Sequence, residues 1–535
     1  MTIKSWTSRR LQYLAILVGT ALLPSLWLGL PGLATERILI NFGPLGRSIA
    51  VEDLETYART GKLNNELKDL GRYLSPQQLQ QFRDGLTLSA DVDVVTVSQF
   101  LYTPQGEAIL ESLGEVVQTA GRINGDRAIR AALILAAADS DGGFNLLNIL
   151  QHFPTEGAQV DVQRLSVVAR AVLGEINQTQ QAVAQVRQQA IAGAEPDSGA
   201  VSIVDDPAEL GSFRWQKQVL NQLTLPTDLY LPAGQNAPLV VISHGLGGDR
   251  TTFAYLAEHL ASHGLAVAVV EHPGSSSAQI EALLTDQTDE AIEPDEMIRR
   301  ATSIQTLLDQ LETVAQDPAL GSRINLDRVG VLGQSLGGYT TLALAGATVD
   351  PASLEQNCPP QISSQLNLSM LLQCSVLTLP QPLPTLQDSR VKAAIAINPL
   401  DSAVFGPAGM ANITVPTMVV SGSADSVTPA LAEQIRPVTW LEAPERYLML
   451  MENGTHFSTI FDPQADTEAL PVPPQAIGPD PAAAQQYVKA TGVAFFKTYL
   501  AEVEGYRPYL NQTYIDILSQ PDLPLYLVRD FTLEE

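Results

Sequence analysis

The chain has 535 residues, of which 45% are hydrophobic and 17% are charged, and its formal net charge is −27. A chain of this length is expected to form two domains with appended segments, and its aliphatic content is typical of folded rather than disordered protein. Nucleic acids and anionic membrane patches are bound by clustered Lys and Arg side chains, so this charge argues against both classes of partner.

The first segment has the pattern of a signal peptide. Arg9 and Arg10 precede an apolar stretch, residues 11–30, and a run of small residues ends at Ala34. This pattern predicts a signal peptide over residues 1–34 with cleavage after Ala34, and therefore export to the periplasm or out of the cell. The alternative is an uncleaved segment that associates with the membrane, because about 20 apolar residues can span a bilayer.

Residues 35–179 are predicted to form a separate, all-helical domain of unknown role. A capping signal at Ser75 precedes a helical pattern, and the Ala-rich segment 126–139 is apolar enough to be a buried helix. The chain then becomes rich in Gln and Ala, and later in Pro and Gly. We therefore predict a helix tail that passes into a linker, and we assign the linker to residues 180–210.

The pattern changes after this linker. Short aliphatic runs, each ending in turn residues, alternate with segments of helical length. The alternation predicts an α/β fold over residues 211–535, in which helices cover both faces of a mostly parallel sheet. In such sheets the functional residues collect at the carboxyl ends of the strands. Candidate site residues are therefore expected directly after the aliphatic runs.

Residues 350–389 interrupt the alternation with an insertion rich in Leu and Pro. A cap over an acyl pocket and a plain surface elaboration are equal alternatives for it. The two cysteines of the chain, Cys358 and Cys374, both lie in this insertion. In an exported protein we expect them to form a disulfide, which would contribute about 3 kcal/mol by closing the loop. The alternative is a pair of inert thiols.

The segment 333–337 has the form G-x-S-x-G. The aliphatic run before it predicts a strand and the pattern after Gly338 predicts a helix, so Ser335 is expected on a sharp strand-to-helix turn. In that context Ser335 is predicted to be a nucleophile, because the flanking glycines remove side chains that would collide in the turn. The alternative is a small residue in a tight packing turn.

A serine hydroxyl needs a base, and the base needs a carboxylate that orients it. His456 is the only histidine after Ser335 and follows the last aliphatic run, so we predict that it is the base. Asp425, in the loop after the preceding run, is predicted to be the acid, and Asp401 competes with it. Either aspartate is alternatively a turn or capping residue.

Acyl transfer also generates an oxyanion, which requires backbone N–H donors placed in advance. The residue after the nucleophile, Leu336, is predicted to give one donor. Leu246, in the Gly-rich segment 243–248, is predicted to give the other, because glycines allow the backbone to approach a substrate closely. An ordinary Gly-rich turn is the alternative for this segment.

Three further residues are predicted to line the substrate site because they adjoin these donors and the nucleophile. They are His244, Gly245 and Gln334. His244 and His272 both lie at strand ends near the mouth of the site. For these two histidines a structural role, in which the ring binds a loop, is an alternative to contact with substrate.

Residues 243–276, "SHGLGGDRTTFAYLAEHLASHGLAVAVVEHPGSS", and the later segment "DRVGVLGQSLGG" carry a recognisable pattern. They closely resemble the platelet-activating-factor acetylhydrolase and dienelactone-hydrolase-like branch of the α/β-hydrolases. The likeness covers residues 236–345 well and residues 390–460 more loosely. It implies an α/β-hydrolase fold, with oxyanion donors at Leu246 and Leu336.

The resemblance also implies the nucleophile at Ser335 and the base at His456. The acid does not follow the acetylhydrolase pattern. In those enzymes it follows the sixth strand, where this chain has Asn398. Asp425 instead matches the more general α/β-hydrolase position after the next strand. The resemblance therefore implies the chemistry more firmly than the acetylhydrolase substrate.

The expected function is that of an exported serine hydrolase, cleaving short-acyl or lipid-like carboxylic esters through an acyl-enzyme, with no metal or organic cofactor. One alternative is a dienelactone- or polyester-type hydrolase. Another is a non-catalytic envelope scaffold that binds a partner through its helical domain. An exported helical region before a hydrolase is similar to a bacterial family of predicted dienelactone hydrolases with an uncharacterised N-terminal domain, and that likeness implies no substrate.

Overall fold

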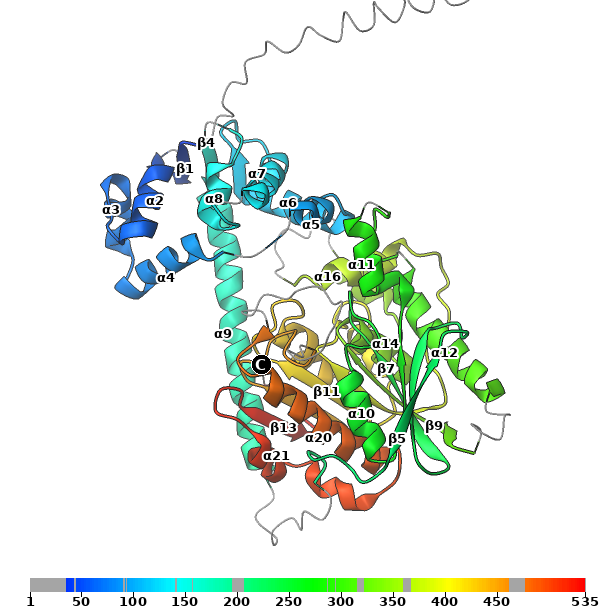
Figure 1. Ribbon diagram of the computed structural model, residues 1–535. Helices are drawn as coiled ribbons and strands as arrows, with labels where there is room; N and C mark the ends of the chain where they lie inside the picture. Colours follow the sequence, from blue (N-terminus) through cyan, green and yellow to red (C-terminus); the bar gives the residue numbers. More distant parts are fainter. Residues whose placement is uncertain are drawn as a thin grey trace, which may run out of the picture. The chain divides into compact units, whose positions relative to one another are not determined.

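The structure is a computed structural model (Figure 1). It describes residues 35–534 apart from 43–44, 90–91, 93, 140–141, 156, 195–205, 286, 294, 315–321, 359–366 and 461–476. The chain divides into two compact units. The N-terminal unit takes in residues up to Val97 together with Leu113–Leu165, and the C-terminal unit takes in Ser98–Ser112 and Ser166–Glu535.

The segment predicted to be a signal peptide, residues 1–34, lies outside the described residues. Among the helices formed by the described residues, none has the length and the apolar run that a membrane crossing requires. Cleavage after Ala34 therefore stays a prediction.

The N-terminal unit is rich in helices but also contains a small sheet ordered β2-β1-β4-β3. We predicted helices alone, because strands of three to six residues are too short to display a sustained alternation of apolar and polar residues. The elements between residues 37 and 161 are β1 (Arg37–Phe42), β2 (Leu45–Ala50), α2 (Val51–Thr60), α3 (Asn65–Leu70), η1 (Gly71–Tyr73), α4 (Pro76–Thr87), α5 (Val94–Leu101), α6 (Pro104–Val116), β3 (Val117–Thr119), α7 (Asp126–Ala138), α8 (Leu146–Gln151) and β4 (Gly157–Asp161). The end of α5 and most of α6 fall in Ser98–Ser112, which belongs to the C-terminal unit.

The C-terminal unit is built on a nine-stranded sheet ordered β13-β12-β11-β10-β9-β7-β8-β6-β5. Strands β7 to β12 are parallel to their neighbours within that group, whereas β5, β6 and β13 are antiparallel at the edges. This is the mostly parallel sheet that the sequence predicts. The strands are β5 (Trp215–Leu220), β6 (Thr227–Pro232), β7 (Ala237–Ser243), β8 (Ala266–Val270), β9 (Ile324–Gln334), β10 (Val391–Ile397), β11 (Thr417–Gly422), β12 (Arg446–Met451) and β13 (Leu525–Arg529).

Helices cover both faces of this sheet (Figure 1). Side chains of α10 and α20 pack with Val240 and Val267 on one face, and those of α12 and α14 pack with Val241 and Ala268 on the other. Because successive strand residues point to opposite faces, both sets must be apolar. The remaining elements are α9 (Val162–Ala192), α10 (Ala254–Ser262), η2 (Pro273–Ser275), α11 (Ser277–Leu284), α12 (Glu296–Val314), α14 (Leu336–Ala345), α15 (Pro351–Asn357), α16 (Met370–Ser375), η3 (Val376–Thr378), α17 (Gly406–Met410), η4 (Leu431–Ile435), α18 (Arg436–Val438), α20 (Pro481–Tyr499), η5 (Glu504–Tyr509) and α21 (Gln512–Leu518).

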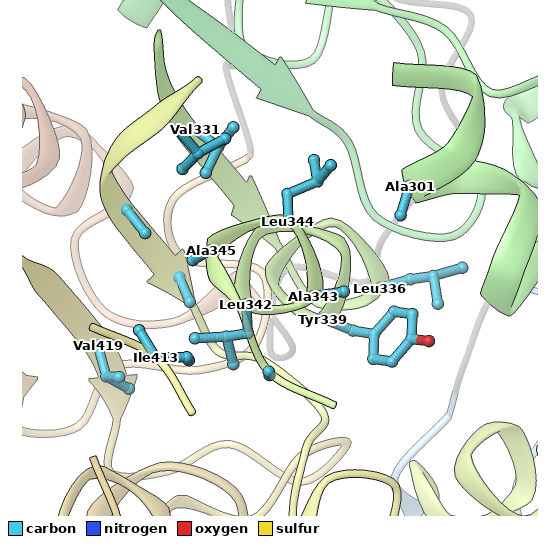
Figure 2. Close-up of a cluster of buried hydrophobic side chains, with 14 of the residues drawn as sticks. Ala301, Val331, Leu336, Tyr339, Leu342, Ala343, Leu344, Ala345, Ile413 and Val419 are labelled. Atoms are coloured by element: carbon cyan, nitrogen blue, oxygen red, sulfur yellow. The ribbon is translucent and has the colours of Figure 1, made fainter. Parts of the chain in front are cut away.

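Helix α14 follows β9 and is buried along its whole length. Figure 2 shows its side chains packed among Val331 of β9, Val419 of β11 and Ala301 of α12. A helix that has neighbours on all sides must be apolar on all sides, and α14 carries no charged residue. Gly338 permits a close approach, since a Cβ there would lie 3.0 Å from Pro399 Cα. The start of the helix is thereby held against the end of β10.

Helix α9 extends into the segment that we predicted to be a linker. Ala182, Val186 and Ala190 recur every four residues, so they share one face of the helix, and all three are buried in the core of the C-terminal unit. The side-chain amides of Gln185 and Gln189 pair with backbone groups of the segment after β13. The Gln- and Ala-rich composition therefore forms an anchored helix, and the predicted linker begins later than residue 180.

The insertion carries α15 and α16 and is fastened by buried contacts. Cys358 and Cys374 form the predicted disulfide, with their Cα atoms 5.6 Å apart. Glu433 of η4 is fully buried and accepts hydrogen bonds from Ser369 Oγ over 3.1 Å and from Gln373 Nε2 over 3.0 Å. Gln373 Oε1 in turn accepts two backbone N–H groups from the chain after β10. Helix α16 is thus tied to two other elements of the unit.

Candidate active site

Ser335 lies where β9 ends and α14 begins, as the G-x-S-x-G pattern predicts. Its φ of 57° and ψ of −120° are rarely adopted by residues other than glycine. Strain of this kind costs about 1–3 kcal/mol and persists only where the surroundings enforce it. The Ser335 N–H donates to the carbonyl of Ile397 over 2.8 Å. The turn is thereby fixed to the end of β10.

The two glycines of the pattern make room for this turn. A Cβ at Gly333 would lie 2.2 Å from Gly337 O, and a Cβ at Gly337 would lie 2.0 Å from Ser243 O. Both distances are far below van der Waals contact, so a larger residue at either position would force the turn away from β7. The pattern is therefore explained by steric fit in this turn.

The structure brings the predicted acid and base together. His456 Nδ1 lies 2.7 Å from Asp425 Oδ2, and the two residues come from the loops after β12 and β11. Asp425 Oδ1 accepts the N–H groups of Val427 and Thr428, each over 2.8 Å, and Thr428 Oγ1 donates to Oδ2 over 2.8 Å. The side chain of Asp425 has no exposed surface. These donors fix the carboxylate in its orientation toward the imidazole.

The loops that carry the acid and the base are docked on each other. The Ala424 N–H donates to Gly454 O over 2.8 Å. A Cβ at Gly422 would lie 2.6 Å from the same carbonyl, so a glycine is needed for the two loops to meet. The spacing of Asp425 from His456 is therefore set by backbone contacts as well as by their own side chains.

A buried glutamine joins the base to the nucleophile turn. Gln334, directly before Ser335, is 2% exposed and donates from Nε2 to the carbonyl of His456 over 3.0 Å. We predicted this residue to lie beside the substrate. In the structure its amide nitrogen holds the loop of the base next to the turn that carries Ser335, and a contact with substrate stays a prediction.

Asn398 follows β10, where the resemblance to the acetylhydrolases would have placed the acid. Its Oδ1 accepts the Gly422 N–H over 3.1 Å, and its Nδ2 donates to Thr455 O over 3.2 Å. Its carbonyl oxygen also lies 3.2 Å from Thr428 Oγ1, whose proton has Asp425 Oδ2 as its nearer acceptor. A neutral amide can donate and accept at once, which an ionised carboxylate cannot do. Asn398 therefore links the loops of the acid and the base.

The competing aspartate, Asp401, does not meet the histidine. Its side chain is fully buried, and no described residue donates a hydrogen bond to either carboxyl oxygen. Burial raises the pKa of the Asp401 carboxyl well above its ordinary range, and the nearby charge of Glu433 raises it further. A protonated carboxyl cannot stabilise an imidazolium. Asp425 is the aspartate that the geometry favours.

We predict that Asp401→Asn makes the protein more resistant to urea, and that this gain grows as the pH rises from 5 to 7. The folded protein keeps a proton on Asp401 that the unfolded chain loses above a pKa of about 3.9, so the residue costs more stability as the pH rises. Urea unfolding followed by tryptophan fluorescence measures the gain in stability, and a gain that does not vary with pH would contradict the prediction.

The Gly-rich segment after β7 lies against the nucleophile. A Cβ at Gly245 would lie 3.3 Å from Ser335 Cβ and 2.5 Å from Gln334 Oε1. Gly245 is thus the residue through which this segment contacts the turn. The next residue, Leu246, is 39% exposed, and neither its N–H nor that of Leu336 donates to another described residue. Two unengaged amide donors therefore lie close to the nucleophile in the chain.

His244 and His272, at the ends of β7 and β8, form buried hydrogen bonds with each other and with neighbouring residues. The His272 N–H donates to His244 Nε2 over 3.0 Å, which leaves His244 Nδ1 to donate to Gly245 O over 2.6 Å. His272 Nε2 lies 2.9 Å from Ser243 Oγ. Burial, with the charge of Arg300, lowers the pKa of His244 to about 3 and that of His272 well below its ordinary value. We predicted His244 to line the substrate site; its ring is instead fully buried and engaged.

Beside the acid loop the described residues form a cavity of about 910 Å³. It is lined by α9, by the loops after β11 and β12, and by Leu368 of the insertion. Of the predicted site residues only Asp425 lies in this lining, so the cavity adjoins the acid rather than the nucleophile. No group of three or more His, Cys, Asp and Glu side chains in the described part of the chain is placed to bind a metal ion.

A serine, an aspartate and a histidine follow β9, β11 and β12 in that chain order, on a sheet with helices on both faces. This is the arrangement of the α/β-hydrolases, and the predicted fold class is confirmed. Residues 34–161 match the family described as "Alpha/beta hydrolase of unknown function (DUF1400)". Residues 210–324 match the family described as "Platelet-activating factor acetylhydrolase, isoform II", which confirms the predicted resemblance.

Individual relatives match over shorter segments. A platelet-activating factor acetylhydrolase of Canis lupus familiaris is 51% identical over 49 residues, which are 9% of this chain and 11% of that protein. Cutinase 1 of Thermobifida cellulosilytica is 31% identical over 129 residues, which are 23% of this chain and 40% of that protein. A cutinase of Thermobifida fusca is 31% identical over 129 residues, covering 35% of its length. The chain thus spans less than half of each of these relatives.

Sequence reasoning missed Thr428, and it located Asn398 without predicting that this residue bridges the loops of the site. Thr428 lies three positions after Asp425, a spacing at which an Asp side chain commonly bonds to the backbone and hydroxyl of a following Thr. That local pattern was readable. Asn398 acts between three loops, and no local signal in the sequence predicts such a role.

Proposed function

We propose that this protein is a serine ester hydrolase, with Ser335 as nucleophile, His456 as base and Asp425 as acid. The observation that carries the proposal is the 2.7 Å contact between His456 and Asp425. A second hydrogen bond, from Gln334 to the carbonyl of His456, ties that pair to the strained turn of Ser335. Such a turn is the conformation expected of a nucleophile held at the end of a strand.

In the proposed reaction Ser335 Oγ attacks the carbonyl carbon of the ester while His456 Nε2 accepts the hydroxyl proton. The tetrahedral intermediate expels the alcohol, which receives that proton from His456, and the acyl group remains on Ser335. Water then attacks the acyl-enzyme, His456 accepts its proton, and collapse releases the carboxylic acid and returns the proton to Ser335. No co-reactant other than water enters this scheme.

Asp425 is proposed to select the tautomer of the base. Its carboxylate accepts a hydrogen bond from the N–H at His456 Nδ1, which keeps the proton on Nδ1 and leaves the lone pair of Nε2 available to the nucleophile. It also stabilises the imidazolium that forms in each half of the reaction. The hydrogen bonds from Val427 and Thr428 hold it in place for both tasks.

The amide N–H groups of Leu246 and Leu336 are proposed to stabilise the oxyanion. Leu336 opens α14, and the first N–H groups of a helix have no partner within it. Leu246 directly follows Gly245, which touches the nucleophile turn. Donors placed in advance in this way lower the barrier because they need no rearrangement as charge develops.

Carboxylic esters with short-acyl or lipid-like groups are the proposed substrates. Support comes from the similarity to proteins named as acetylhydrolases and cutinases. The similarity to cutinases also keeps a polyester-type substrate as the second candidate. This site differs from the acetylhydrolase pattern, because Asn398 stands where that pattern has its acid and bridges two loops.

Export is proposed from the predicted signal peptide and is supported by the disulfide between Cys358 and Cys374. Structural disulfides are typical of oxidising compartments, such as the periplasm and the exterior of the cell. The role of the N-terminal unit is not part of this proposal. A partner-binding scaffold remains the alternative for the whole chain.

A fluorophosphonate probe tests the proposal directly, because it phosphonylates a serine only where a base and oxyanion donors activate it. We expect stoichiometric labelling of the purified protein at Ser335, located by peptide mass spectrometry. Denatured protein is the matched control and should remain unlabelled. Well-folded protein that does not react would favour the scaffold alternative and refute the enzyme.

A further inference from the structure

Behind the segment 244–248 lies a fully buried cation, Arg300 of α12. Its Nη2 donates to the carbonyl of His244 over 2.7 Å, and its Nε donates to Ser275 Oγ over 3.1 Å. Its counter-ion is Glu296, whose Oε1 lies 3.6 Å from Nε. Arg300 thus contacts both the Gly-rich segment and the loop after β8.

These two contacts act on the chain just before and just after Leu246. His244, whose carbonyl Arg300 binds, precedes Leu246 by two residues. Gly247, directly after Leu246, donates its N–H to the carbonyl of Ser275 over 2.9 Å, and Ser275 Oγ is the second acceptor of Arg300. The peptide unit that carries the Leu246 N–H therefore lies between the carbonyl of His244 and the N–H of Gly247. Arg300 binds the first directly and the second through Ser275.

The ring of His244 is arranged so that the carbonyl remains the main acceptor of Arg300. His244 Nε2 accepts the His272 N–H, so the ring proton lies on Nδ1. A protonated Nδ1 cannot accept a hydrogen bond from the guanidinium. Arg300 Nη2 is 3.3 Å from that nitrogen but 2.7 Å from the carbonyl oxygen. The cation therefore acts on the backbone of the Gly-rich segment.

Burying a guanidinium has a large desolvation free energy, so a role that only fills space does not account for an arginine at this position. Taking an ion out of water costs several kcal/mol unless good partners compensate, and apolar residues often fill such a position at lower cost. Burial lowers the pKa of Arg300 to about 10, while Glu296 opposes that shift. The group stays charged at neutral pH, so its charge-assisted hydrogen bonds persist under working conditions.

We propose that Arg300 is the positioning residue of the oxyanion site, holding the Leu246 N–H in the direction that the developing oxyanion requires. This inference rests on the proposed function. Arg300 has its hydrogen bonds with His244 and Ser275, so we infer that it acts through these residues and not by contact with the reacting atoms. Loss of the arginine should therefore weaken transition-state binding while leaving ground-state binding of the ester nearly unchanged.

Kinetics of Arg300→Met on p-nitrophenyl acetate test this role. We expect kcat to fall by about 10- to 100-fold with KM within threefold, because one misdirected oxyanion donor costs up to about 10²–10³-fold. An alkyl boronic acid, which forms a tetrahedral adduct on the serine, should lose affinity by the same factor as kcat/KM. Arg300→Lys, which keeps the charge, should recover part of both.

Arg299→Met is the matched control, since Arg299 pairs with the same Glu296 from the same helix but does not contact the Gly-rich segment. It should change kcat by less than twofold. Equal losses in Arg299→Met and Arg300→Met, or an effect on KM alone, would overturn the positioning role. Active wild-type protein with a fully active Arg300→Met would reject this inference and leave the proposed function intact.

Hydrogen exchange supplies a readout that does not depend on activity. In Arg300→Met, and in Arg300→Lys if the first variant folds poorly, we expect faster exchange in the peptide that covers residues 244–248. Peptides from the sheet core should be unchanged. Unaltered exchange in that segment would refute the inference whether or not the protein hydrolyses esters. Inactive wild-type protein with altered exchange would refute the proposed function and, with it, the oxyanion role, and would leave Arg300 only as a support of the segment 244–248.

Discussion

Ser335→Ala is expected to abolish ester hydrolysis, lowering kcat on p-nitrophenyl esters by at least about 10⁴-fold, because removing the nucleophile of a triad leaves only the oxyanion donors and binding. Rates on esters of graded acyl length measure the loss, and the wild-type ranking separates short-acyl from lipid-like substrates. The melting temperature should change little, since alanine occupies the same strained turn. Retention of most of the activity in folded Ser335→Ala would refute the assignment.

Ser335→Gly is a useful companion because it separates strain from chemistry. Glycine adopts a φ of 57° without the penalty that a side chain incurs, so this variant should be inactive but more stable than the wild type by about 1 kcal/mol. A stability–activity trade of this kind is expected where the fold enforces an unfavourable turn for function. Equal stability of the Gly and Ala variants would mean that the turn stores little strain.

The features that were readable from the sequence are those with local causes. The aliphatic runs predict strands buried on both faces, and the glycines around Ser335 predict a turn in which a Cβ at Gly333 or Gly337 would collide with backbone. His456 and Asp425 were predicted from chain order, strand ends and, for His456, the family resemblance, and the structure places the two side chains in contact. For the strands and the turn the signal lies within a few residues of the feature, whereas the order of the three site residues is a pattern of the whole domain.

The features that were not readable depend on contacts between distant segments. The end of α9 resembles a linker in composition, and only its packing on the core and its amide pairs near residue 532 make it a helix of the C-terminal unit. His244 looks like a site residue because it adjoins Gly245, yet its ring is turned into a buried network with Arg300. Neither outcome has a local cause, so neither has a local signal.

Asn398 follows β10, one strand away from the aspartate that we propose as the acid. In the structure the loop after β11 places Asp425 against His456, and the residue after β10 is an amide that bridges the loops through Gly422 and Thr455. The bridge needs both a donor and an acceptor, which explains why an amide fits that position.

Asp425→Asn should lower kcat by about 10⁴-fold near neutral pH, because an amide favours the imidazole tautomer whose Nε2 already carries a proton. Asp401→Asn is the matched control, an equally buried aspartate one strand away whose carboxyl no described residue bonds, and it should keep kcat within about twofold. Measured kcat/KM between pH 6 and 9 distinguishes the two variants.

Adding Asn398→Asp to Asp425→Asn should not restore activity, since a carboxylate would face the Thr455 carbonyl that Asn398 now binds. Full rescue by that change, or a larger loss in Asp401→Asn than in Asp425→Asn, would show that the acid has been assigned to the wrong strand.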